Sequence, residues 1–91
     1  MRAIDKFEAG FGEHNYEWTR GYQVISVTPH ETDRLRLTAW VLVDRMQNEK
    51  VKVRVQTYGK DQVVFKYGQR HVASVHMSPD YHWHVFVEDM E

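Results

Sequence analysis

The stretch RLRLTAWVLVD at residues 34–44 is followed closely by KVKVRVQT at residues 50–57. In both stretches the odd positions are almost all apolar, as at Leu37, Val41 and Val53, while most even positions are polar. Such a period of two is typical of β-strands, whose side chains point in turn to opposite faces of a sheet. The two stretches therefore predict strands that turn their odd-numbered residues toward the core.

The same odd-numbered pattern extends along the chain from residue 21 onward. Turn-forming residues such as Gly, Pro, Asn and Asp separate the successive segments. The predicted strands are residues 21–28, 34–44, 50–57, 62–67, 71–77 and 82–88. Short connections allow only antiparallel neighbours, so we expect a mainly β fold: a six-stranded antiparallel meander that forms a curved sheet or a small barrel.

The first twenty residues follow a different pattern. Ile4, Phe7 and Phe11 have the i, i+3, i+7 spacing of an amphipathic helix, and Gly10 and Gly12 would end it. We therefore predict a short N-terminal helix over residues 2–11 that packs on the apolar face of the sheet. Residues 1–20 would form a helical or irregular arm, and residues 21–88 the sheet of a single domain.

Length and composition exclude several classes of protein. The chain has 91 residues, no cysteine and no apolar run long enough to span a membrane. It lacks an uninterrupted apolar stretch after its first basic residues, so no signal peptide is expected. It also contains no Gly-rich phosphate loop or other catalytic motif. We expect a cytoplasmic protein that is not an enzyme.

The net charge of −1 conceals an uneven distribution. Residues 1–33 carry −3, residues 34–70 carry +6, and residues 71–91 carry −4. If the strands at 34–44 and 50–57 pair as a hairpin, Trp40 faces Lys52 or Arg54. An aromatic ring among cations suits a binding platform. We assign partner binding to this basic strip, which comprises Arg34, Arg36, Trp40, Lys50, Lys52 and Arg54.

Histidines are concentrated near the C-terminus. His82 and His84 share one strand face, and a hairpin with residues 71–77 places His76 opposite one of them. Two histidines on one strand and a third on its neighbour resemble the zinc site of carbonic anhydrases over those three residues. The sequence thus offers a candidate zinc site at His76, His82 and His84. A solvated polar patch is the alternative.

The leading functional prediction is a small binding module that acts through a protein–protein interface. Small single-domain chains without cysteines or catalytic motifs are typical of accessory and inhibitor proteins from bacteria and their viruses. Two alternatives stay open: single-stranded nucleic-acid binding by the basic face around Trp40, and the three-histidine metal site. Free sheet edges also favour self-association, so we expect a homodimer.

Overall fold

The computed structural model describes residues 1–33, 35–59, 68–78 and 81–90. These residues form seven β-strands. The strands are β1 (Arg2–Gly10), β2 (Gly12–Thr19), β3 (Gln23–Pro29), β4 (Arg36–Asp44), β5 (Lys50–Gly59), β6 (Arg70–Ser78) and β7 (Tyr81–Met90). In the parts of the chain that the structure describes, no helix could carry the chain across a membrane.

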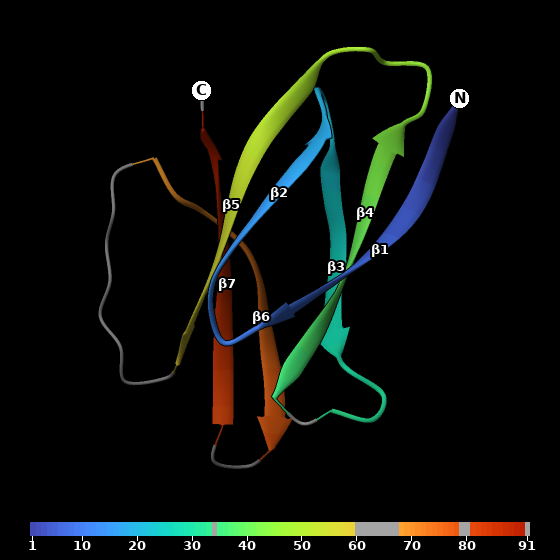
Figure 1. Cartoon of the computed structure of the whole chain (residues 1–91). Coiled ribbons are helices and arrows are strands. Elements are labelled where there is room, and N and C mark those ends of the chain that lie inside the picture. The colour runs from blue at the N-terminus through green and yellow to red at the C-terminus, as the bar shows by residue number, and fades with distance from the viewer. Residues whose placement is uncertain (34, 60–67, 79–80, 91) are drawn as a thin grey trace.

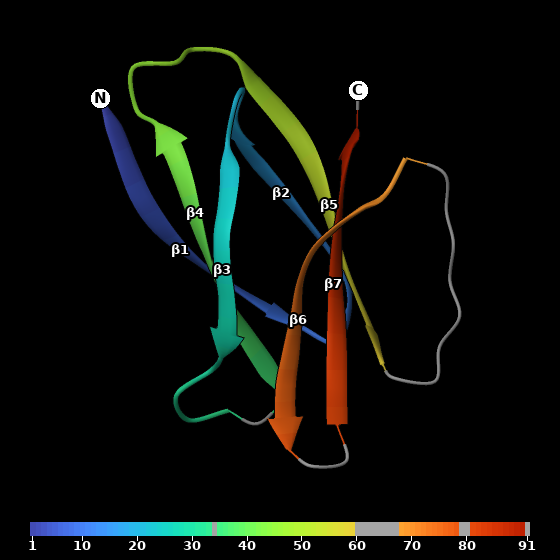
Figure 2. The same ribbon diagram turned by 180° about the vertical axis from the view of Figure 1, so that it is seen from behind.

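The strands belong to two antiparallel sheets rather than one. The first sheet has the order β1-β4-β3, and the second has the order β2-β5-β7-β6. Figures 1 and 2 show the two sheets as layers, with their strands crossing at an angle. The mainly β, antiparallel prediction is therefore confirmed. The prediction of a single six-stranded meander, as a curved sheet or a small barrel, is wrong, because the strands form two open sheets and the chain repeatedly crosses from one layer to the other.

The predicted N-terminal helix is also wrong, since residues 2–19 form β1 and β2. The two strands meet at a corner, Gly10-Phe11-Gly12, from which they enter different sheets (Figure 1). Gly12 has a φ of 101°, a conformation that only glycine adopts without strain. Along β1 the side chain of Phe7 reaches the core, whereas Ile4 faces outward. Ile4 and Phe7 therefore lie on opposite faces of a strand, although their spacing in the sequence suits one face of a helix.

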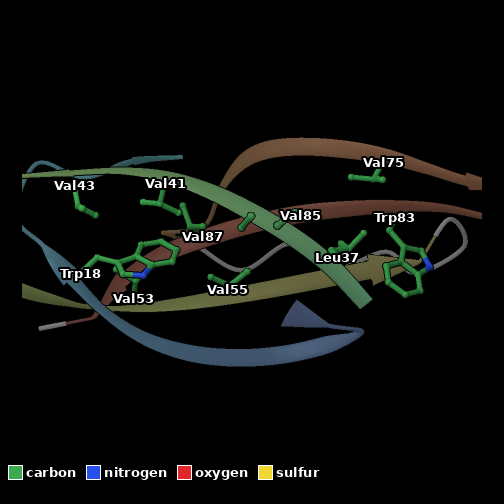
Figure 3. Packing of buried hydrophobic residues seen from close by; sticks show 11 residues of the cluster. Trp18, Leu37, Val41, Val43, Val53, Val55, Val75, Trp83, Val85 and Val87 are labelled. Atoms are coloured by element: carbon green, nitrogen blue, oxygen red, sulfur yellow. The ribbon is translucent and has the colours of Figure 1, made fainter. Parts of the chain in front are cut away.

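The core lies between the inner faces of the two sheets. Val41 of β4 and Val53 of β5 have no exposed surface, and Val87 of β7 is almost as buried. Figure 3 shows the inner side chains of β4 lying against those of β5 and β7. The odd-numbered residues of these strands form the core, as predicted. Burying one such aliphatic side chain contributes about 1.5–3 kcal/mol to stability.

A row of aromatic side chains extends this core where β1 and β2 diverge. Trp18 is only 2% exposed and contacts Phe7, Tyr16 and Tyr22, with ring centroids 4.9–5.3 Å apart. On β2 the inward residues are even-numbered, which is the opposite parity to that of β4 and β5. The change occurs at the corner before Gly12. The inward residues of β1 are odd-numbered, and beyond the corner those of β2 are even-numbered, although both strands face the same core.

Tyr22 also ties the first sheet to the second. Its hydroxyl donates to Asp89 Oδ1 at 2.5 Å and accepts from Arg70 Nη2 at 2.7 Å. Burial, together with the hydrogen bond to Asp89, raises the pKa of the Tyr22 phenol above its ordinary value. The neutral phenol thus joins the segment before β3 to β6 and β7.

The predicted hairpin of residues 34–44 and 50–57 does not form. β4 pairs with β1 and β3, and β5 pairs with β2 and β7, so residues 45–49 connect one layer to the other. The predicted C-terminal hairpin is confirmed as β6–β7, with His76 opposite His82. The strand predicted at residues 62–67 lies outside the described residues.

Replacing Trp18 should test the aromatic row. Trp18→Ala should lower the free energy of unfolding by about 3–5 kcal/mol, because it leaves a cavity between the sheets. Trp40→Ala is the matched control and should cost no more than about 1 kcal/mol, since this indole is 37% exposed. Urea unfolding followed by circular dichroism measures both values. Equal losses in the two variants would contradict this account of the core.

The corner between β1 and β2 gives a second test. Gly12→Ala should destabilise the protein by about 1–2 kcal/mol through its positive φ alone, because an added Cβ meets no atom within 4 Å. Gly10→Ala should be nearly neutral, since Gly10 has no positive φ and its Cβ would make only ordinary contacts, with the His14 ring and the Leu35 carbonyl oxygen. Thermal melts of the two variants should differ, and identical melting temperatures would refute the role of Gly12.

Candidate functional site

The outer face of the three-stranded sheet carries the exposed apolar residues Ile4, Ile25 and Trp40. Ile4 is 58% exposed and lies directly opposite Leu42 in the β1–β4 register. Trp40, two residues before Leu42 on the same side of β4, lies opposite Lys6. Together with Ile25 of β3, these five residues form what we call the Trp40 face.

Ile25 reaches this face through a β-bulge. Val24 pairs with Val41 and Ser26 pairs with Trp40, so Ile25 is the extra residue between them. The side chain of Ile25 is 49% exposed and lies outside the core, although the alternation of the sequence predicts it inside. The bulge therefore turns an apparent core residue into a surface residue beside Trp40.

A small hollow adjoins the Trp40 ring. It has a volume of about 100 Å³ and lies between β4, β1 and the β3–β4 loop. The Trp40 indole Nε1 donates to Thr28 Oγ1 at 3.4 Å, and Lys6 Nζ lies 6.0 Å from the ring centroid. These contacts hold the ring across the sheet surface. The hollow is lined by Lys6, Thr28, Pro29, His30, Glu31, Thr32, Thr38 and Trp40.

The loop that forms one wall of the hollow is anchored by His30. Its Nδ1 accepts hydrogen bonds from the backbone N–H groups of Thr32 and Asp33 at 3.2 and 3.0 Å. Nε2 therefore carries the proton and donates to Glu8 Oε1 at 3.1 Å. Arg36 Nη1 donates to the other oxygen of Glu8 at 3.2 Å. The hydrogen bond from His30, reinforced by Arg36, holds the pKa of Glu8 below its ordinary value.

The predicted basic strip is divided between two faces of the molecule. Arg36 and Trp40 lie on β4 in the first sheet, whereas Lys50, Lys52 and Arg54 lie on β5 in the second. Trp40 consequently faces Lys6, not Lys52 or Arg54. Arg34 lies outside the described residues.

Arg36 and Arg54, the two arginines of the strip that the structure describes, are paired with carboxylates. Arg54 Nη1 donates to Glu88 Oε1 at 3.3 Å, and its Nε lies 3.5 Å from Glu13 Oε1. Arg36 contacts Glu8 and also Asp33, the latter at 3.2 Å. The acidic ends of the chain thus lie beside its basic middle and locally neutralise it.

The three candidate metal ligands lie on the outer face of β6 and β7. His76 and His82 are direct neighbours with stacked rings, whereas His84 Nδ1 lies 2.8 Å from the hydroxyl oxygen of Ser74. The Ser74 hydroxyl is also 2.8 Å from His71 Nε2. Within the described ranges, no three potential metal ligands come close enough to hold one ion.

A second depression lies where β1 and β2 diverge. It has a volume of about 260 Å³, with Phe7 and Trp18 among its lining residues. Arg45 and Asp5, also in the lining, are joined by an ion pair at 2.5 Å. Sequence reasoning did not foresee this depression, because one side of it is formed by β1 and β2, which were predicted as a helical or irregular arm.

Sequence reasoning also missed Ile4, Lys6 and Ile25 as surface residues. For β1 a signal exists: Arg2, Ile4, Lys6 and Glu8 alternate with Ala3, Asp5, Phe7 and Ala9. That signal is weak, because the inward set contains Asp5 and the outward set contains Ile4. For Ile25 the signal is the adjacent apolar pair Val24-Ile25, because a bulge adds one residue and moves the inward positions from Val24 to Val27.

The lowered pKa of Glu8 makes stability depend on pH. Its contribution is fully present above about pH 4.5 and is lost as the pH falls through the lower pKa of the folded state. Glu8→Gln should therefore reduce the free energy of unfolding at pH 6 to 7, and the deficit should shrink toward zero below pH 4. Denaturant titrations at several pH values measure this deficit. In a His30→Ala background the same substitution should cost less, and an unchanged, pH-independent cost would contradict the pairing.

Comparison with known proteins identifies the family of this chain. No curated protein and no solved structure matches this chain significantly. The profile of one protein family, described as a domain of unknown function (DUF7352), matches residues 1–91. Because this match extends over all 91 residues, the chain belongs to the DUF7352 family.

Proposed function

We propose that this protein is a non-enzymatic binding module that recognises another protein through the Trp40 face. The observation that carries this proposal is a group of adjacent apolar side chains on all three strands of one sheet, of which Ile4, Ile25 and Trp40 are exposed and Leu42 is partly exposed. Ile4 on β1 pairs with Leu42 on β4, Trp40 lies two residues before Leu42, and Ile25 is the bulge residue of β3 between the partners of Val41 and Trp40. Exposed apolar groups that adjoin one another typically mark an interaction surface.

The composition of the face supports a protein partner. An apolar centre with an aromatic residue, surrounded by uncharged polar groups such as Gln23, Ser26 and Thr28, has the anatomy of a protein interface. Tryptophan is among the residues that contribute most to binding energy in such interfaces. The hollow beside Trp40 has room for one small side chain of the partner.

Charge favours a protein over a nucleic acid at this face. Phosphate binding needs several unpaired cations along one surface. Among the described residues around Trp40, Lys6 is the nearby cation, while Arg36 is engaged by Glu8 and Asp33. Lys50, Lys52 and Arg54 face away on the other sheet. An accessory or inhibitor-type role in the cytoplasm of a bacterial or virus-infected cell suits such a module.

Site-specific photocrosslinking tests the proposal. A photoreactive phenylalanine analogue replaces Trp40 in one variant and Lys52, on the opposite outer face, in the control. Position 40 should give a discrete protein adduct in extracts of the source cells, and position 52 should not. Adding Ile4→Asp should abolish that adduct, because a buried unpaired charge is costly in an apolar interface, whereas the fold should survive a substitution at this exposed site.

The nature of the adduct distinguishes the alternatives. An adduct of twice the chain mass would identify a second copy of this chain as the partner and would support the predicted homodimer. A nuclease-sensitive adduct would overturn the proposal in favour of nucleic-acid binding. Adducts that form equally from both positions, or an adduct insensitive to Ile4→Asp, would overturn the assignment of the interface.

A further inference from the structure

A pair of histidines on the β6–β7 hairpin is the basis for a second site. His76 and His82 are directly opposite in the antiparallel register, and their ring centroids are 4.3 Å apart with an angle of 20° between the ring planes. Their neighbours Val75 and Trp83 are buried in the core, so both histidines project from the outer face of the four-stranded sheet. The strand ladder therefore fixes two imidazoles side by side.

The other two histidines of this face, His71 and His84, are engaged by a neighbouring hydroxyl group. His71 and His84 both contact the Ser74 hydroxyl at 2.8 Å. For His76 and His82, the described residues provide ring stacking but no hydrogen bond to a ring nitrogen. The side chain of His76 is exposed and that of His82 is partly exposed. A solute in water can consequently reach this pair.

The geometry of the pair suits chelation. Two imidazole nitrogens that bind one tetrahedral ion at about 2.0–2.1 Å lie roughly 3.3 Å apart. Because nearly parallel stacked rings direct their nitrogens along separate planes, both rings must turn about their side-chain bonds until a nitrogen of each points at the same ion. The strands need not change, since the register already places the two residues opposite each other. Neutral imidazole is a preferred ligand of zinc, nickel and copper, and it is a poor ligand for magnesium or calcium.

We propose that His76 and His82 together chelate one divalent transition-metal ion, such as Zn²⁺, with water completing its coordination. This two-ligand site replaces the three-histidine site predicted from the sequence, because His84 is turned toward Ser74. The site is independent of the proposed function, since the Trp40 face belongs to the outer surface of the other sheet. An ion here would join β6 to β7 and would stabilise the hairpin that these strands form.

Calorimetric titration of tag-free protein with zinc chloride at neutral pH tests the proposal. The wild-type chain should bind one ion, and His76→Ala and His82→Ala should each weaken binding by about tenfold or more. His71→Ala is the matched control, because it removes a histidine from the same face and should leave the affinity unchanged. Circular dichroism of the metal-free variants confirms that each one folds.

A second measurement separates imidazole ligands from carboxylates. Zinc should raise the melting temperature of the wild type and of His71→Ala, but not that of His76→Ala or His82→Ala. This increase should disappear below pH 5, where protons displace the metal from imidazoles. The proposal is overturned if zinc at millimolar concentration does not bind. It is also overturned if both alanine variants at positions 76 and 82 bind zinc as the wild type does.

Discussion

The whole molecule depends on the contact between the inner faces of its two sheets. Val41 on one side and Val53 on the other have no exposed surface, whereas their neighbours Trp40 and Lys52 are exposed. Each strand therefore contributes one face to the core and presents the other to its surroundings. In the described structure, parts of both outer faces are exposed to solvent. The Trp40 face and the histidine pair belong to different ones.

The strands with clear alternation were predictable because a half-buried strand imposes a period of two on its own residues. β4, β5 and β7 show this pattern, and their odd-numbered valines form the core. β1 was misassigned for a physical reason. Its inward side includes Asp5, and its outward side includes Ile4, so the weak alternation was obscured by a spacing that also suits a helix. Propensity and spacing are local properties, whereas the choice between strand and helix here is made by pairing with β4.

The candidate site was likewise predictable where it depends on the local sequence pattern and not where it depends on strand pairing. The outward direction of Trp40 followed from its parity on β4. A tight hairpin left His76 opposite either His82 or His84, and the structure pairs it with His82. Which strands lie beside β4 did not follow, because residues 45–49 are long enough either to close a hairpin or to cross between layers. That choice depends on the total apolar surface that the two sheets bury. The predicted basic strip failed as a single surface for this reason.

The pairing of β1 with β4 and of β2 with β5 also constrains the order of events during synthesis. The first two strands are neighbours in sequence but have no ladder with each other, and their partners lie in residues 36–44 and 50–57. Phe7, Tyr16 and Trp18 therefore emerge from the ribosome well before the strands that cover them. Contacts so distant in sequence make folding slow, typically in the range of milliseconds to seconds for all-β domains. During that interval the N-terminal segment is the part of the nascent chain most open to chaperones and to aggregation.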